Sequence, residues 1–389
     1  MAAAHPFLRG GFRPFFFGGA AWAVIAVALW LCTLAGKLLL PTAFDPVAWH
    51  RHEMLFGFVG AVIAGFLLTA IPNWTGRLPI AGKPLLALFA LWLAGRMSVL
   101  FSGIIGAFPA AALDAGFFLV LAALAAREVL EARNRNLPIV GILLLFGLAD
   151  AIDHAAAASL IQGDFGWQAA IALIALMISL IGGRITPSFT RNWMVKRGIT
   201  ERLPTQPGRF DMFVIGATAL ALFGWLSAPA GLFTGALLIG AAVLQAARLA
   251  RWGGARTFSD PLVLVLHLGY AWIPIGLLLL GLSLAGLGIP RSAAIHALTA
   301  GAMATMIVAV MTRASLGHTG RELRASAPTV AVYALVTFGA VLRVSAALGL
   351  GAYHPMMDAA GTAWAAALAI FLFAYGPILW RPRLGEAAA

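Results

Sequence analysis

The 389-residue sequence contains few charged residues and almost no cysteine. Only 10% of its residues are Asp, Glu, Lys or Arg, whereas soluble globular domains contain about 25%. The single cysteine, Cys32, excludes disulfides within the chain, and without a C-x-x-C-H motif any haem must be bound non-covalently. The absence of Walker A, H-E-x-x-H and C-x-x-C motifs disfavours ATP-driven work and zinc peptidase chemistry. With 62% hydrophobic residues, the composition indicates a polytopic membrane protein.

Long apolar runs recur along the whole chain. A membrane span needs about 20 mostly apolar residues. The predicted spans are 14–35, 50–72, 83–102, 107–127, 138–161, 167–185, 210–227, 229–249, 260–285, 292–313, 326–349 and 358–380. The first run is too long for a secretory signal and lacks a cleavage site, so we expect it to remain as a span. The sequence therefore predicts an all-α fold, with a single transmembrane domain of twelve helices over residues 1–389.

The positive charge is unevenly distributed between the two sides of the predicted membrane. The net charge is +12, and most of the 26 Lys and Arg lie near the two termini or in the even-numbered loops. The longest loop is predicted at 186–209 and is strongly basic. Because positive residues are retained on the cytoplasmic side, both termini are predicted to be cytoplasmic. The basic excess is explained in this way, and we predict no nucleic-acid partner.

Histidines inside spans or at their ends are the most informative polar residues. The candidate ligands are His50, His52, His154, His267 and His296. Imidazole is costly to place in lipid unless it is paired, and histidine is the commonest metal and haem ligand. With the predicted orientation, all but His267 lie toward the outer side. This distribution predicts a buried metal or haem centre.

Two of these histidines, His50 and His52, open the second span. Residues two apart point about 200° apart on a regular helix, so the two cannot face one centre. The face of His50 continues through small residues such as Gly57, which would leave room for a flat macrocycle, whereas the face of His52 continues through bulky Phe56. We therefore favour His50 as an inward axial ligand, with Glu53 as a supporting polar group; an interfacial histidine pair is the alternative.

Two further spans pair a histidine with a polar neighbour. Asp150 lies four residues before His154 and can accept its second N–H, as carboxylates do beside metal ligands. A proton-path group and a simple interhelical hydrogen bond are alternative roles for His154. In the ninth span, Tyr270 lies three residues after His267 and would suit proton or electron delivery.

The tenth span and the predicted cytoplasmic turns complete the candidate set. His296 has small neighbours that would let a bulky group approach. Arg77, Arg184 and Arg321 lie in basic turns on the cytoplasmic side and can bind carboxylates, including haem propionates. Ordinary anchoring of helix ends is the alternative role for these arginines.

Several separate segments resemble the NnrS family of bacterial membrane proteins. They are Gly11–Phe16 (GFRPFF), Trp49–Phe58 (WHRHEMLFGF), Pro72–Arg77 (PNWTGR), Arg184–Asn192 (RITPSFTRN), His267–Gly276 (HLGYAWIPIG) and Gly317–Arg321 (GHTGR). The resemblance implies a twelve-span, haem- and copper-containing protein of the bacterial inner membrane that is linked to the response to nitric oxide and nitrosative stress. Histidines on spans 2 and 10 are also similar to the low-spin haem pair of haem-copper oxidases, whose catalytic subunits likewise have twelve spans.

Together these observations predict a haem- and copper-binding membrane protein that binds or metabolises nitric oxide. A b-type haem would be ligated by His50 and His296, with His154 and His267 as ligands for copper or a second haem and His52 available to either. If the protein is an enzyme, it is a haem-dependent oxidoreductase acting on nitric oxide, and its electron donor is not identified. A hydrocarbon-lined site suits nitric oxide, which crosses lipid without a polar channel.

Two other functions fit the same sequence. Twelve spans with both termini inside also fit a proton-coupled secondary transporter built from two six-span halves. Its coupling groups would then be intramembrane Asp and His side chains. The third candidate is a haem or copper handling protein that serves another reductase.

Overall fold

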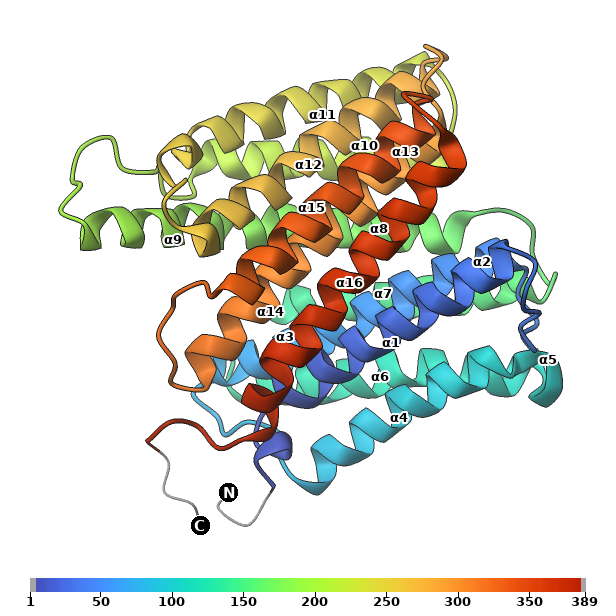
Figure 1. Ribbon diagram of the computed structural model, residues 1–389, viewed down its shortest axis with the longest axis horizontal. Coiled ribbons are helices and arrows are strands. Elements are labelled where there is room, and N and C mark those ends of the chain that lie inside the picture. The colour runs from blue at the N-terminus through green and yellow to red at the C-terminus, as the bar shows by residue number, and fades with distance from the viewer. Residues whose placement is uncertain (1–4, 386–389) are drawn as a thin grey trace. The chain divides into compact units, whose positions relative to one another are not determined.

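The computed structural model describes residues 5–385, and these residues form helices and connecting segments without any strand (Figure 1). Within residues 5–385, twelve helices are long and apolar enough to cross a membrane. The predicted all-α, twelve-helix fold is therefore confirmed. The single domain over 1–389 and the cytoplasmic location of the termini stay predictions.

Eight of the twelve candidate spans are single α-helices, and three are composite runs built around a π-helical segment. The remaining span, Leu232–Arg256, consists of α11 (Leu232–Ala250) and the short η4 (Gly254–Arg256). The single helices are α1 (Phe12–Leu34), α4 (Lys83–Leu100), α6 (Ala107–Glu131), α7 (Leu137–Ala157), α10 (Arg209–Ser227), α12 (Pro261–Leu284), α15 (Ala327–Ala347) and α16 (Tyr353–Trp380). The short elements are η1 (Pro6–Leu8), α5 (Ser102–Ile105) and η4 (Gly254–Arg256).

The composite runs are the second, sixth and tenth spans, and each contains a π-helical segment. They are α2 (Pro46–His52), η2 (Glu53–Val59) and α3 (Gly60–Thr75); α8 (Phe165–Met177), η3 (Ile178–Gly182) and α9 (Gly183–Lys196); and α13 (Arg291–His296), η5 (Ala297–Met303) and α14 (Ala304–His318). A π segment changes the helical phase and is frequent at functional sites. Two of the candidate histidines, His52 and His296, directly precede such a segment.

Two predicted boundaries were wrong. The loop expected at 186–209 is helical up to Lys196, so α9 extends well into it, and the tenth span, expected to end at 313, continues in α14 to His318. Both boundaries were placed where the apolar run ends. A helix satisfies its own backbone hydrogen bonds, so it can continue past the hydrocarbon into polar surroundings.

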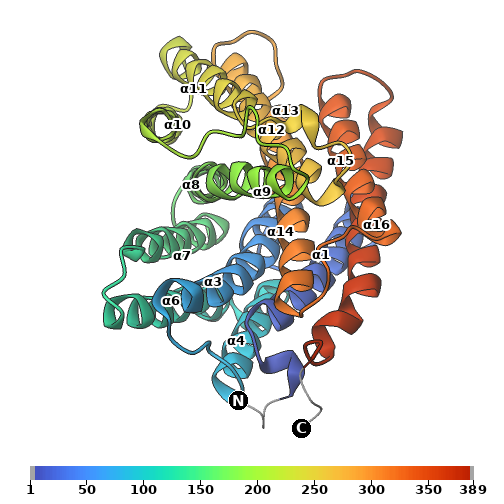
Figure 2. The same cartoon turned by 90° about the vertical axis from the view of Figure 1, so that its left-hand side faces the viewer.

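The chain divides into two compact units, each described by itself. Unit 1 comprises residues up to 170, 314–322 and residues from 368 onward; unit 2 comprises 171–313 and 323–367. Within unit 1, α6 packs against α3, α4 and α7, and α1 packs against α3 (Figure 2). Within unit 2, α12 packs against α11, α13 and η5.

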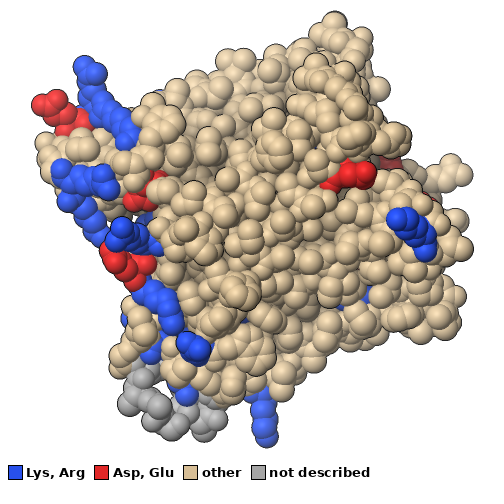
Figure 3. Space-filling view, viewed as in Figure 1, with Lys and Arg blue, Asp and Glu red and all other residues tan. Residues whose placement is uncertain are grey.

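The interior of unit 1 is rich in aromatic rings, and its polar side chains lie among them. Phe56, Phe118 and Phe146 contact one another with ring centroids 5.1–6.3 Å apart. Across the face shown in Figure 3, most of the surface carries neither acidic nor basic side chains, as expected where helices meet lipid. Charged residues inside the bundle are therefore the exceptions that need a partner.

Candidate metal centre

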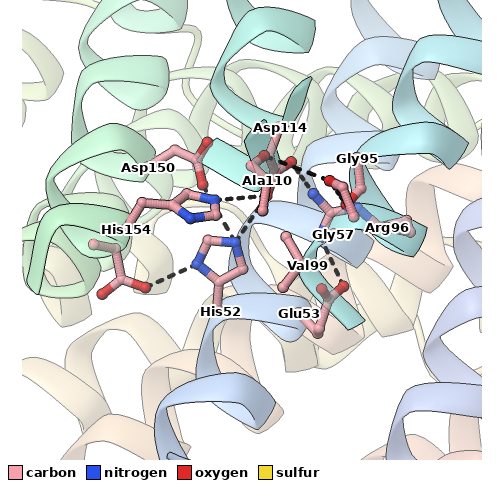
Figure 4. A network of polar contacts seen from close by, with 12 residues as sticks. His52, Glu53, Gly57, Gly95, Arg96, Val99, Ala110, Asp114, Asp150 and His154 are labelled. Atoms are coloured by element: carbon pink, nitrogen blue, oxygen red, sulfur yellow. Dashed lines mark hydrogen bonds and ion pairs between the residues drawn. The ribbon is translucent and has the colours of Figure 1, made fainter. Parts of the chain in front are cut away.

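Unit 1 holds a buried group of four side chains with the spacing of a metal site. The His52 cluster consists of His52, Asp114, Asp150 and His154, and one ligand atom from each lies within 4.8 Å of the others (Figure 4). The side chains come from the end of α2, from α6 and from α7, and all four are buried. The fold thus brings together donors that are up to 102 residues apart in the sequence, from His52 to His154.

His52 lies between carboxylates on both sides of its ring. Its Nε2 is 2.8 Å from Asp114 Oδ2 and 3.5 Å from Asp150 Oδ1, while its Nδ1 is 2.9 Å from Asp153 Oδ2. A carboxylate accepts hydrogen bonds, so both contacts are satisfied only when both ring nitrogens carry hydrogens. A metal ion at this position would take the place of one of those hydrogens.

Asp150 and His154 are less completely satisfied. His154 Nε2 lies 3.3 Å from Asp114 Oδ2, so the carboxylate nearest to it is Asp114 rather than the expected Asp150. Both carboxylate oxygens of Asp150 are buried and accept no hydrogen bond from the described residues. Its one ionic contact, with His52 Nε2 at 3.5 Å, is longer than a hydrogen bond, so this side chain fits a site that binds a cation.

Arg96 and Glu53 support the cluster from α4 and η2. Arg96 Nη2 donates to Asp114 Oδ1 and its Nη1 donates to Glu53 Oε2 at 2.7 Å. Glu53 Oε2 also accepts from Trp22 Nε1 at 2.5 Å. Because the arginine holds Oδ1 of Asp114, Oδ2 is left for the two imidazoles. Gly57 makes this arrangement possible, because a Cβ there would lie 2.8 Å from Arg96 Nη1.

The donor set fits a divalent transition-metal ion. Two imidazole nitrogens and two carboxylate oxygens suit ions such as Cu(II), Zn(II) and Fe(II), whereas Cu(I) prefers sulfur ligands. A haem does not fit at His52, because both ring nitrogens face carboxylates and the ring packs against Phe44 and Phe56 with centroids 4.7 and 5.0 Å away. The cluster is therefore a candidate site for a single metal ion.

A comparison with known families identifies the chain. The family profile described as NnrS protein matches residues 6–383, nearly the whole length. The chain belongs to the NnrS family. The resemblance seen in the sequence is confirmed, and membership indicates a multi-pass membrane protein related to nitric oxide. No curated protein matches the chain.

In this NnrS-family chain, His50 lies outside the His52 cluster. Its half-buried ring stacks on Trp30, with centroids 4.8 Å apart and planes 16° from parallel. The structure thus places His52, on the bulky face of the helix, in the buried cluster. The bulky face is inward because the interior of unit 1 is itself aromatic. The axial-ligand role of His50 stays a prediction.

The other two candidate histidines belong to unit 2. His296 Nδ1 donates to Ser292 O at 2.7 Å, which leaves the lone pair on Nε2, the tautomer that binds metal through Nε2. His267 Nε2 is 2.8 Å from Thr190 Oγ1, which donates to the Thr186 carbonyl. His267 Nδ1 accepts no hydrogen bond from the described part of the chain. A Cβ on Gly254 would lie only 2.6 Å from it, so the backbone there covers Nδ1.

Tyr270 belongs to a separate group in unit 2 that we call the Arg248 network. Its members are Arg248, Asp211, Ser179, Gln245 and Tyr270, and all five are buried. Arg248 Nε donates to Asp211 Oδ1 at 2.7 Å and its Nη1 donates to Tyr270 Oη at 2.9 Å. The hydroxyl of Tyr270 donates to Gln245 Oε1 at 2.7 Å. The tyrosine hydroxyl is therefore engaged by this network rather than by His267.

The three arginines expected to bind carboxylates lie in different surroundings. Arg77, between α3 and α4, pairs with Glu128 and Glu131, and the hydrogen bond that it donates to Glu128 raises the pKa of Arg77. Partial burial, followed by the charge of Arg381, lowers the pKa of Arg321. Arg184 is exposed on α9. The acidic partners of Arg77 already occupy the donors that a haem propionate would need.

Sequence reasoning singled out Glu53 but not one ligand candidate, Asp114, or two other side chains that contact the cluster, Arg96 and Asp153. All three lie inside predicted spans. The signal that identifies them is an ionisable residue within an apolar run, which calls for a partner wherever it occurs. Applied to acids and arginines as well as histidines, that rule would have found all three.

Proposed function

We propose that this NnrS-family protein lies in the bacterial inner membrane, with both termini in the cytoplasm, and binds nitric oxide at a metal centre. Copper is the proposed metal of the His52 cluster. The observation that carries this proposal is the buried set of four donors, in which the Asp150 carboxylate accepts no hydrogen bond from the described residues. A non-covalent b-type haem is proposed outside the cluster, with His50 as its candidate ligand in unit 1 and His296 as a candidate ligand in unit 2.

The residues of the cluster have distinct roles in this proposal. His52 and His154 would bind the metal through imidazole nitrogens, and Asp114 and Asp150 would supply the negative charge that retains a dication. Arg96 orients Asp114 by holding its second oxygen. When bound, the copper ion would supply an open coordination position and redox chemistry for a small ligand.

The surroundings of the cluster favour a neutral, diatomic ligand. Phe44 and Phe56 pack against His52, and Phe44 also contacts the ring of His154, with centroids 5.2 Å apart. These rings exclude water from the donors. Nitric oxide is uncharged and dissolves in hydrocarbon, so it needs no polar channel to reach a site enclosed in this way.

The proposal is tested by metal analysis and spectroscopy of detergent-purified protein. Wild type should contain copper and show a Cu(II) electron paramagnetic resonance signal with nitrogen hyperfine structure, together with a Soret band. His154→Ala should lose the copper, and the change in the copper signal on adding nitric oxide, but keep the Soret band. His354→Ala, exposed at the start of α16, should keep all of them. Unchanged copper in His154→Ala would overturn the assignment.

A second function, proton-coupled transport, is favoured by one observation. His52 bridges Asp114 and Asp153 through both ring nitrogens, an arrangement that holds protons within a membrane span without any metal. If the purified protein contains neither copper nor haem, proteoliposomes with an imposed pH gradient should be tested next. His52→Ala should then abolish proton-coupled uptake, while His354→Ala should not.

A further inference from the structure

A half-exposed arginine lies between the His52 cluster and the protein surface. Arg51 Nη2 is 3.5 Å from Asp153 Oδ1, and the other oxygen of Asp153 binds His52 Nδ1. Arg51 Nη1 is 3.8 Å from Asp164 Oδ1. The exposed fractions of these side chains are 51% for Asp164, 26% for Arg51 and 2% for Asp153. Asp164, Arg51 and Asp153 therefore form a series of charged groups that leads from solvent to the His52 cluster.

The contacts of Arg51 hold it loosely. Both of its ion pairs are longer than a hydrogen bond, and its buried Nε has no partner among the described residues. Arg96, by contrast, is fully buried and makes close hydrogen bonds to two carboxylates. Arg51 can therefore move without breaking any close hydrogen bond to the part of the chain that the structure describes.

Asp164 and Trp167, which bond to each other, form a fixed site to which the Arg51 side chain can move. Trp167, near the start of α8, donates from Nε1 to Asp164 Oδ1 at 2.8 Å, and the guanidinium of Arg51 lies 4.8 Å from the Trp167 ring centroid. Gly166 lets this end of α8 approach α7, because a Cβ there would lie 2.5 Å from the Asp153 nitrogen. Full pairing with Asp164 would release Arg51 from Asp153.

We propose that Arg51 controls the access of cations to the His52 cluster, an inference that rests on the proposed metal site. A metal ion cannot cross hydrocarbon, so it must approach along polar groups, and the carboxylates of Asp164 and Asp153 mark such an approach. The guanidinium of Arg51 lies between these two carboxylates and repels an incoming metal ion until it turns toward Asp164. Neutral nitric oxide is not subject to this control.

The test measures rates of metal exchange. Purified protein is stripped of metal, and Cu(II) uptake and its later removal by EDTA are followed by electron paramagnetic resonance. Arg51→Met keeps an apolar stem over Trp167 and removes the charge. We expect uptake and removal to be about tenfold faster with the same final copper content, since charges at an entrance act on rates. Arg197→Met is the matched control, because Arg197 also lies over a tryptophan ring, that of Trp193.

A second variant acts in the opposite direction. Asp164→Asn keeps an acceptor for Trp167 Nε1 but removes the charge that attracts Arg51, so uptake should be about threefold slower. Unchanged rates in both variants, or a lower final copper content in Arg51→Met, would overturn the role of Arg51 and leave the metal site standing. A wild-type protein that binds no Cu(II) would instead overturn the proposed function, and the access role with it.

Discussion

The two units each bury a polar cluster, and the clusters differ in how completely they satisfy themselves. In the Arg248 network, one arginine faces one buried aspartate, and the hydroxyl and amide groups bond to one another. In the His52 cluster and its surroundings, four carboxylates face fewer cations, and Asp150 accepts no hydrogen bond from the described residues. A balanced network stabilises a fold, whereas surplus buried charge calls for a ligand.

Both clusters also adjoin a π-helical segment. A π segment leaves backbone carbonyls available, and in each unit a side chain from a neighbouring helix donates to one of them. Arg248 Nη1 donates to the Ser179 carbonyl in η3 at 2.8 Å, and Trp92 Nε1 donates to the Gly57 carbonyl in η2 at 3.1 Å. A hydrogen bond from a side chain to a π-segment carbonyl thus supports the structural network in unit 2 and also the candidate site in unit 1.

The largest expected effect is the loss of the Arg248 charge. Arg248→Met leaves Asp211 buried without its close partner, and this should lower the free energy of unfolding by about 3–5 kcal/mol. Thermal and denaturant unfolding in detergent measure this loss of unfolding free energy. Copper per folded protein should not change, because the network holds no metal ligand. Arg251→Met, the control, removes a more exposed charge 3.9 Å from Asp211 Oδ2 and should cost about 1 kcal/mol or less. An equal loss in both variants would contradict the structural role of Arg248.

The next effect has the opposite character, because Asp150→Asn removes a buried charge that accepts no hydrogen bond from the described residues. Copper affinity should fall at least about 100-fold, since groups that only support metal ligands already contribute 10–100-fold. The metal-free variant should be no less stable than metal-free wild type, because it no longer buries that carboxylate. Copper titrations check the expected fall in affinity, and unfolding curves of the metal-free variant and metal-free wild type check the expected stability. Exposed Asp358→Asn is the control. A metal-free variant that is clearly less stable would make Asp150 a structural residue.

The fold was far easier to predict from the sequence than the site. Apolar length is a property of a single segment, so twelve spans could be counted directly. The cluster depends on which helices become neighbours. The His50 face was favoured because small residues line it, yet His52 is the residue that reaches Asp114, which lies on another helix. The π segment that begins at Glu53 also changes the helical phase, and no spacing rule for a regular helix anticipates it.

The smallest expected effect tests how tightly the Arg248 network is packed. A Cβ on Gly183, which begins α9 directly after η3, would lie 2.6 Å from Arg248 Cζ. Gly183→Ala should therefore cost about 1–3 kcal/mol of unfolding free energy through overpacking. Gly141→Ala, where a Cβ would meet nothing within 4 Å, is the control and should cost nothing. Because Met can bend away from the new methyl group, Gly183→Ala should cost less in an Arg248→Met background. If the free-energy costs of Gly183→Ala and Arg248→Met are fully additive, the methyl group displaces something other than the Arg248 guanidinium. The network would then have room for more than its own side chains.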